Sequence, residues 1–407
     1  MSDEYISLAR RCFTSYRFSV SSTTKIQVSN NMALLRCACV LALAAVAAVS
    51  GSCDVSVPDL SYKLSGTNMV FPCDSTKGIY ISSGRYIPRN VIATRMQIYK
   101  DEAIVALPRY KHGVPFTLAK FSMKARGCQA NLTPFPCWSM QEEGNCDALQ
   151  SVVDIFICQS DILWVLDIGL VNTLEQPVRR CGPKIVGINL KTNQVVKVID
   201  LTNLVVPSSR LQYIIVDYTC DGRPFVYVAD AGAGAIIVYD VFGAKGYRVV
   251  LPTACTATAK DVLYMVLVRR QCGNYVYFSY LSSPKMYHIK SESLQKGQTA
   301  GAIVEVGAKP EGVKGVLLGT DNAGSILFRY KGQSDVYIWN TDTCFKDENF
   351  ILVQRGTECR LPTHVVPGYK RLMWTIESNF HDYIAGTAGC LGPNVVVHPV
   401  VKTCDEE

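Results

Sequence analysis

Short segments of alternating apolar and polar residues recur along the chain, each followed by a turn and a second alternating segment. Alternation with a period of two predicts β-strands, and the Gly- or Asn-containing turns predict antiparallel hairpins. The equivalent central positions of six segments are separated by 59, 63, 50, 51 and 46 residues. These positions are Val105, Trp164, Tyr227, Tyr277, Phe328 and Trp374. Six units of this length predict an all-β fold, a six-bladed β-propeller, in preference to a sandwich.

The amino-terminal residues have the pattern of a targeting segment. Met32 begins a short basic stretch that precedes an apolar run ending at Val49, with small residues after it. This pattern predicts a signal peptide at 32–51, after a non-native extension at 1–31, with a signal anchor as the alternative. Residues 52–90 are then expected to lead into the propeller, which is predicted to occupy 91–404. The mature protein is expected to be secreted and extracellular.

Charge and cysteine content narrow the possible partners. The chain has 41 basic and 34 acidic residues, and removal of 1–51 takes away five basic and two acidic ones, leaving a net charge of +4. No basic run indicates a nucleic-acid partner, or a membrane partner after signal cleavage. Fourteen of the 17 cysteines would remain, and an even number in a secreted chain predicts disulfides. Asn131 begins a glycosylation sequon.

Several of the repeated segments also resemble the insect yellow / major royal jelly protein family. The resemblance lies in the following segments: Pro108–Leu118, Cys146–Ser151, Leu163–Gly169, Cys181–Lys184, Phe225–Asp230 and Tyr337–Thr341. It runs from about residue 90 to 380. The region Val250–Tyr275 departs from it, because a glycine-rich strand is not recognisable there and two cysteines are present. The sequence therefore resembles a divergent member of the family.

The resemblance implies a secreted six-bladed propeller linked to pigmentation or the melanin pathway. In such a protein the channel is expected to bind a small aromatic amine or a catechol- or quinone-type ligand. One alternative is a dopachrome-converting enzyme of the tautomerase or decarboxylase type. Another is an extracellular structural or nutritional protein without a small-molecule site. No standard catalytic motif, metal-ligand spacing or cofactor motif decides among them, so no metal and no cofactor are predicted, and enzymatic activity and oligomeric state stay open.

Two aspartates end predicted strands and are candidates for the ligand-binding site. Asp167 follows Leu163–Leu166, and Asp230 follows Phe225–Ala229. At one end of a propeller channel, these carboxylates would pair with an ammonium group. The alternative is that each caps a tight turn through the backbone.

Further candidates carry amide, aromatic or basic groups. Asn340 matches a family segment that contributes to an amine pocket, with a turn residue as the alternative. Tyr110 and Trp339 are candidate pocket aromatics, because a ring face attracts a cation, with core packing as the alternative. Arg109 with His112 is a candidate for polarising a quinone carbonyl, or Arg109 ties neighbouring blades together.

Overall fold

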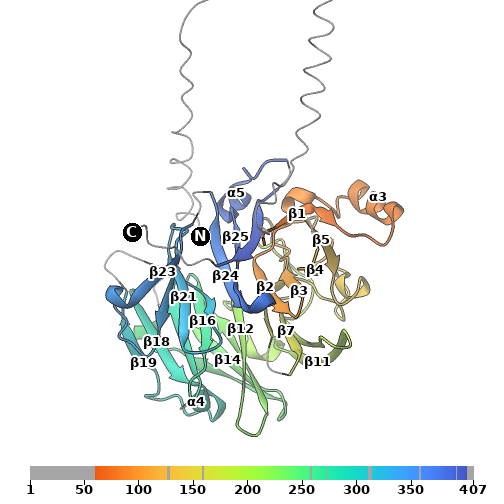
Figure 1. Ribbon diagram of the computed structural model, residues 1–407. Helices are drawn as coiled ribbons and strands as arrows, with labels where there is room; N and C mark the ends of the chain where they lie inside the picture. Colours follow the sequence, from red (N-terminus) through yellow and green to blue (C-terminus); the bar gives the residue numbers. More distant parts are fainter. Residues whose placement is uncertain are drawn as a thin grey trace, which may run out of the picture.

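The computed structural model describes residues 60–125, 129–157, 160–256, 259–271, 273–309, 314–356, 359–390 and 392–400. The predicted extension and signal peptide lie outside these residues. The described chain is dominated by strands (Figure 1). Its α-helices are α3 (Asp74–Ser82), α4 (Ser291–Gln295) and α5 (Phe380–Ala385). Short 3-10 helices are η1 (Pro88–Asn90), η2 (Ser139–Gln141), η3 (Thr202–Leu204), η4 (Thr253–Cys255), η5 (Asp347–Asn349) and η6 (Tyr369–Arg371).

Four antiparallel sheets have four strands each. The first contains β6 (Val152–Ile157), β7 (Ile162–Asp167), β10 (Lys184–Asn189) and β11 (Gln194–Asp200). The second contains β12 (Leu211–Tyr218), β13 (Pro224–Asp230), β14 (Ala235–Asp240) and β15 (Lys245–Val250). The third contains β16 (Leu263–Val268), β17 (Tyr275–Tyr280), β18 (Lys285–Lys290) and β19 (Val304–Ala308). The fourth contains β20 (Gly315–Thr320), β21 (Ser325–Tyr330), β22 (Val336–Asn340) and β23 (Phe350–Gln354).

An eight-stranded sheet joins the two ends of the described chain. Its strand order is β2 (Arg95–Tyr99), β3 (Glu102–Ala106), β4 (Leu118–Ser122), β5 (Gln129–Pro134), β1 (Tyr62–Met69), β26 (Val395–Pro399), β25 (Met373–Ser378) and β24 (Leu361–Pro367). Strand β1 pairs parallel to β5 and antiparallel to β26. The segment expected to lead into the propeller therefore supplies a strand of this sheet. A small ribbon of β8 (Leu170–Val171) and β9 (Val178–Arg179) lies outside the larger sheets.

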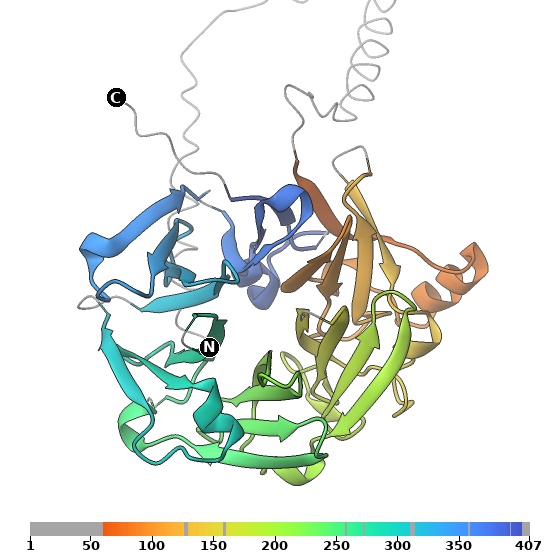
Figure 2. The ribbon, with the colours of Figure 1, turned by 60° about the horizontal axis from the view of Figure 1, so that its bottom comes forward.

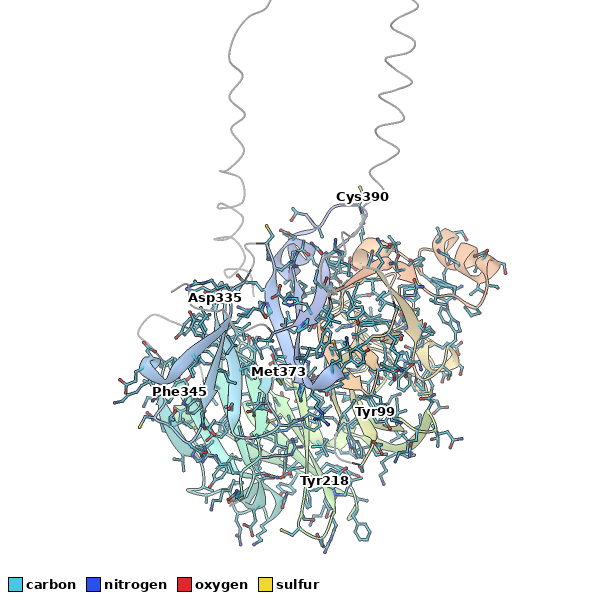
Figure 3. All side chains as sticks on the ribbon, viewed as in Figure 1. Tyr99, Tyr218, Asp335, Phe345, Met373 and Cys390 are labelled. Atoms are coloured by element: carbon cyan, nitrogen blue, oxygen red, sulfur yellow. A yellow bond between two sulfur atoms is a disulfide. The ribbon has the colours of Figure 1, made fainter. Side chains whose placement is uncertain are left out.

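The sheets surround a common centre, as Figure 2 shows. The strands nearest the centre are β2, β6, β12, β16, β20 and β24, and each packs against the next, with β24 returning to β2. Side chains fill the space between neighbouring sheets (Figure 3). The arrangement is that of a propeller, in agreement with the predicted fold class.

The six repeated segments coincide with β3, β7, β13, β17, β21 and β25. Each is the second strand from the centre of the molecule, although the sequence pattern suggested that it led its unit. The second strands are covered on both faces, and β13 for example is buried from Phe225 to Asp230. A strand covered on both faces is a nearly continuous apolar run. These strands therefore give the strongest signal in the sequence, stronger than that of the innermost strands.

The expected disulfide bonding is confirmed by the Cys146–Cys181 pair. This bond ties the segment before β6 to the segment before β10, within one sheet. Among the described residues, no helix is long and apolar enough to cross a membrane. Asn131 lies on β5 and is exposed, so its amide is accessible for the predicted glycosylation.

Candidate functional site

A cavity of about 120 Å³ lies where the six innermost strands meet. Residues of all six strands line it, from Arg95 on β2 to His364 on β24. In the order of the ring, β16 lies opposite β2 and β20 lies opposite β6. The cavity is therefore lined by residues that lie far apart in the sequence.

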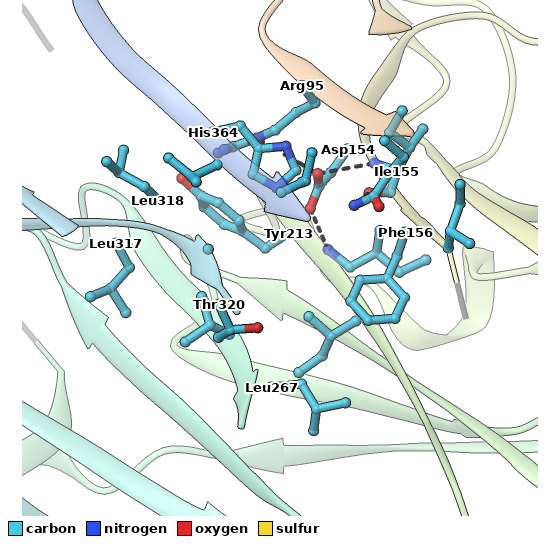
Figure 4. A pocket seen from close by; sticks show the side chains of 18 of the residues that line it. Arg95, Asp154, Ile155, Phe156, Tyr213, Leu267, Leu317, Leu318, Thr320 and His364 are labelled. Atoms are coloured by element: carbon cyan, nitrogen blue, oxygen red, sulfur yellow. Dashed lines mark hydrogen bonds and ion pairs between the residues drawn. The ribbon is translucent and has the colours of Figure 1, made fainter. Parts of the chain in front are cut away.

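The two sides of the cavity differ in chemistry (Figure 4). The side formed by β2, β6, β12 and β24 carries Arg95, Asp154, Tyr213 and His364, which we call the polar wall. The side formed by β16 and β20 is mainly apolar. Its residues, which we call the apolar wall, are Met265, Val266, Leu267, Leu317 and Leu318. A cavity with one polar and one apolar side is typical of a site for a small molecule with a polar edge and an apolar body.

The polar wall depends on local irregularities of the strands. Strand register shifts immediately before Asp154 on β6, before Tyr213 on β12 and before His364 on β24. A fourth shift precedes Gly319 on β20. A β-bulge places two residues opposite one and redirects the side chain that follows, and bulges are common beside functional sites. Three of the four polar-wall side chains thus follow a bulge.

Asp154 is the buried carboxylate of the wall, with an exposed fraction of 4%. Its Oδ1 accepts a hydrogen bond from the backbone N–H of Ile155 at 2.9 Å, and Oδ2 accepts one from Ile214 at 2.8 Å. The Nε of Arg95 lies 3.6 Å from Oδ1. Burial raises the pKa of Asp154 to about 6, although Arg95 and the two backbone donors act in the opposite direction. This carboxyl group can therefore exchange a proton near neutral pH.

Arg95 on β2 contacts three other inner strands, the first of which is β6 through Asp154. Its Nη1 donates to the carbonyl oxygen of Thr363 on β24 at 2.5 Å, and its Cζ lies 4.5 Å from the centre of the Tyr213 ring on β12. The Tyr213 ring in turn lies 5.4 Å from that of Tyr264. Burial raises the pKa of Tyr213 to about 12, and the nearby Arg95 charge opposes that rise. The phenol therefore stays protonated and can donate or accept a hydrogen bond.

His364 completes the wall as a neutral imidazole. Its Nδ1 accepts a hydrogen bond from the backbone N–H of Met96 at 3.2 Å. Loss of solvation and the positive charge of Arg95 lower the pKa of His364 well below its usual value. Because Nδ1 is an acceptor, the ring proton resides on Nε2. His364 is thus a hydrogen-bond donor that stays uncharged at neutral pH.

Of the candidates from the sequence, Tyr110 interacts electrostatically with Arg95 and Asp154 of the polar wall. Its ring packs on Phe380 with 5.8 Å between centres. Burial raises the pKa of Tyr110, and the negative charge of Asp154 adds to that rise. The positive charge of Arg95 lowers the same pKa, so the Tyr110 phenol is in the electrostatic field of both polar-wall residues. Tyr110 is not among the residues that line the cavity.

The other candidates lie away from the cavity. Asp167 and Asp230 are fully buried at the ends of β7 and β13, where backbone N–H groups donate to their carboxylates. Asn340 is exposed at the end of β22 and accepts a hydrogen bond from the N–H of Asp342. Trp339 is buried between Tyr277 and Phe345. These positions agree with the alternative roles given for these residues, in turns or in core packing. That they contact a ligand stays a prediction.

The basic candidates also have local partners. Arg109 is buried and donates to five backbone carbonyl oxygens. His112 Nδ1 lies 2.8 Å from a Glu175 carboxylate oxygen. Neither lines the cavity.

Sequence reasoning missed the four residues of the polar wall. The one available signal was a charged residue inside an apolar strand, as at Asp154 in Val-Val-Asp-Ile-Phe-Ile. No group of three or more His, Cys, Asp or Glu side chains in the described ranges is arranged to hold a metal ion.

Comparison with known proteins places these observations in a family context. The sequence model described as Major royal jelly protein matches residues 150–402. Major royal jelly protein 1 of Apis mellifera is 26% identical over 315 residues, which is 71% of each chain. A protein named dopaminechrome tautomerase, from Drosophila melanogaster, is 27% identical over 175 residues, covering 42% of this chain and 38% of that one. The solved structure of virginiamycin B lyase from Staphylococcus aureus aligns with a TM-score of 0.40 at 10% identity, covering 76% of this chain and 95% of that one.

Proposed function

The chain belongs to the major royal jelly protein family, and from that premise we propose that its central cavity binds a small aromatic amine or a catechol- or quinone-type ligand. The observation that carries this proposal is the contrast between the polar and apolar walls of one central cavity. Arg95 and His364 supply donors for ring oxygens, and Asp154 supplies an acceptor. Tyr213 and the apolar wall supply surface for the faces of a ring.

The size of the cavity favours a compact ligand. A cavity of about 150 Å³ is sufficient for a benzene molecule. The volume of about 120 Å³ is somewhat smaller, so a substituted ring or a small fused ring requires the lining side chains to move on binding.

We infer that the propeller has six blades. The eight-stranded sheet would then be two blades, β2–β5 and β24–β26 with β1, joined at their outer strands. Support comes from the position of β1 between β5 and β26, and from the six innermost strands that pack in a ring. A blade completed by an amino-terminal strand closes the ring and leaves no open gap between the first and last units.

We also propose that the chain is secreted, with cleavage near residue 51 and a glycan on Asn131. The Cys146–Cys181 disulfide supports an oxidising compartment, where such bonds persist. Mass spectrometry of protein from the culture medium of transfected insect cells tests both points, because it reports the mature terminus and the mass at Asn131. Protein retained inside the cell with residues 32–51 still attached would contradict secretion.

A second candidate function is conversion of an aminochrome by proton transfer. It is favoured by the pKa of Asp154, which lies near neutral pH, and by the relative named dopaminechrome tautomerase. A general base works best when its pKa is close to the operating pH.

Calorimetric titration of the mature protein with dopamine, serotonin and dopaminechrome tests the binding proposal. We expect stoichiometric binding of at least one, and at least tenfold weaker binding by Thr320→Phe. Thr320 lines the cavity, and a phenyl ring there takes up space that the ligand needs. Thr343→Phe is the matched control, because Thr343 is exposed outside the cavity. Equal affinities in both variants would place the ligand elsewhere, and no binding at all would favour a structural or nutritional protein.

A further inference from the structure

We propose that Asp154 transfers a ring proton, and that Arg95 stabilises the developing oxyanion, when a cyclised amino-quinone bound in the central cavity isomerises to a dihydroxyindole. This proposal rests on the proposed function and assigns roles to residues of that same cavity. The observation behind it is that a proton acceptor and hydrogen-bond donors lie on one wall of one cavity (Figure 4).

Asp154 is held with its acceptor capacity partly free. Each carboxylate oxygen accepts one backbone N–H, from Ile155 and from Ile214. A carboxylate oxygen has two lone pairs, and the Nε of Arg95 is directed at Oδ1, so Oδ2 is the oxygen that retains one for a further proton. The backbone bonds fix the orientation of the group, and burial keeps competing water away. These are the conditions under which a positioned carboxylate acts as a general base.

Arg95 is held beside Asp154 with donors left for a ligand. A guanidinium has five N–H groups. One is directed toward Asp154, and one Nη1 hydrogen bonds to the carbonyl oxygen of Thr363. The guanidinium group therefore retains N–H donors for a ligand oxygen inside the cavity. His364 adds an uncharged Nε2–H donor from the neighbouring strand.

The reaction is an isomerisation and needs no oxidant or reductant. The Asp154 carboxylate first removes a proton from one of the two saturated ring carbons of the amino-quinone. The electrons of that C–H bond form a ring C=C bond, and the π electrons of a quinone C=O bond move onto its oxygen. Arg95 and His364 stabilise the resulting phenolate. The proton on Asp154 then passes to this oxygen, which gives a quinone methide and restores the carboxylate. The carboxylate next removes a proton from the other saturated ring carbon, and the electrons of that C–H bond make the ring aromatic while the π electrons of the second C=O bond move onto its oxygen. Transfer of this second proton to that oxygen gives the dihydroxyindole and again restores the carboxylate.

The groups facing Asp154 predict a simple dependence on pH. They are Arg95 on β2, Tyr213 on β12, His364 on β24 and the neighbouring Tyr110, and Tyr264 on β16 interacts with Arg95. Arg95 stays charged, the pKa values of Tyr110 and Tyr213 are raised, and that of His364 is lowered. Asp154 is therefore the group expected to change its charge near pH 6. Because the reaction needs the carboxylate, kcat/KM is expected to fall below about pH 6 and to level off above it.

The test follows the loss of dopaminechrome absorbance with the mature wild-type protein and two variants, after subtraction of the uncatalysed rate. Asp154→Asn is expected to lower kcat by about 100-fold to 10,000-fold, which is the usual contribution of a general base. Asp217→Asn is the matched control. Asp217 is also a buried carboxylate, but it binds Asn274 outside the cavity, so its replacement is expected to leave kcat unchanged.

Arg95→Lys keeps the positive charge but loses the planar set of guanidinium donors. This substitution is expected to lower kcat by about tenfold or more. The pH profile of the wild-type protein needs no substitution, so it tests the role of Asp154 even if Asp154→Asn does not fold. A kcat of Asp154→Asn within threefold of wild type, or a flat profile between pH 5 and pH 8, would overturn the assignment. Calorimetry separates the two proposals: binding without turnover overturns only the role of Asp154, whereas no binding overturns the proposed function as well.

Discussion

Arg109→Lys is expected to lower the free energy of unfolding by about 3–5 kcal/mol, the range for breaking a buried charged network. Arg109 has an exposed fraction of 2% and directs its guanidinium at backbone carbonyl oxygens. Nε donates to Val114, Nη1 to Leu149 and Gln150, and Nη2 to Pro115 and Gln141, at 2.6–3.1 Å. A lysine ammonium is a single point with three donors and cannot reach five acceptors around a plane. Its substitution leaves buried carbonyl groups without donors.

Urea unfolding of the two proteins measures this difference. Arg180→Lys is the matched control, because Arg180 is about half exposed and its Nε contacts Glu143 at 2.9 Å. A surface pair contributes at most about 1 kcal/mol, so little change is expected there. If Arg109→Lys were no more destabilised than Arg180→Lys, the carbonyl network would not be a major source of stability.

This network explains an alternative that the sequence left open. Arg109 follows β3, whereas Leu149 and Gln150 immediately precede β6, so the side chain connects two neighbouring sheets. The sequence offered either a group acting on a quinone or a tie between blades. The five hydrogen bonds to carbonyl oxygens correspond to a tie between blades.

The general architecture could be predicted because it depends on strands that are buried on both faces. Strands such as β7 and β13 give apolar runs at regular spacing, and a regular spacing of strand units indicates a propeller. The participation of β1 could not be predicted in the same way. Tyr62–Met69 is a single strand that pairs with β5 on one side and, on the other, with β26, which lies more than 300 positions away. The pairing of β1 with β26 leaves no mark on the local pattern.

The candidate site could not be predicted because its residues are brought together only by closure of the ring. Arg95 and His364 lie on strands at opposite ends of the sequence, and no local spacing relates them. The bulges before Asp154, Tyr213 and His364 also break the period-two alternation by which such strands are recognised. The same irregularities that direct these side chains into the cavity therefore conceal them in the sequence.

Asp167→Asn is expected to lower the free energy of unfolding by about 3 kcal/mol without changing ligand affinity. Asp167 is fully buried, and its carboxylate accepts backbone N–H bonds from Gln150, Ser151 and Gly169 at 2.8–3.0 Å. The Nζ of Lys184 lies 3.8 Å away. An amide replaces one acceptor oxygen with an NH₂ group, which faces a backbone donor, and it leaves the buried ammonium without its counter-charge.

Paired measurements of stability and affinity decide between the two interpretations of this strand end. Asp240→Asn is the control, because Asp240 likewise accepts backbone N–H bonds after a strand but is only partly buried. We expect it to cost less than half as much stability, since water can compensate for the lost acceptor. A weakened affinity of Asp167→Asn for dopamine or serotonin at unchanged stability would instead make Asp167 a ligand-binding residue. Destabilisation at unchanged affinity would mean that this aspartate serves the fold, because its bonds from Gln150 and Ser151 position the start of β6, the strand that carries Asp154.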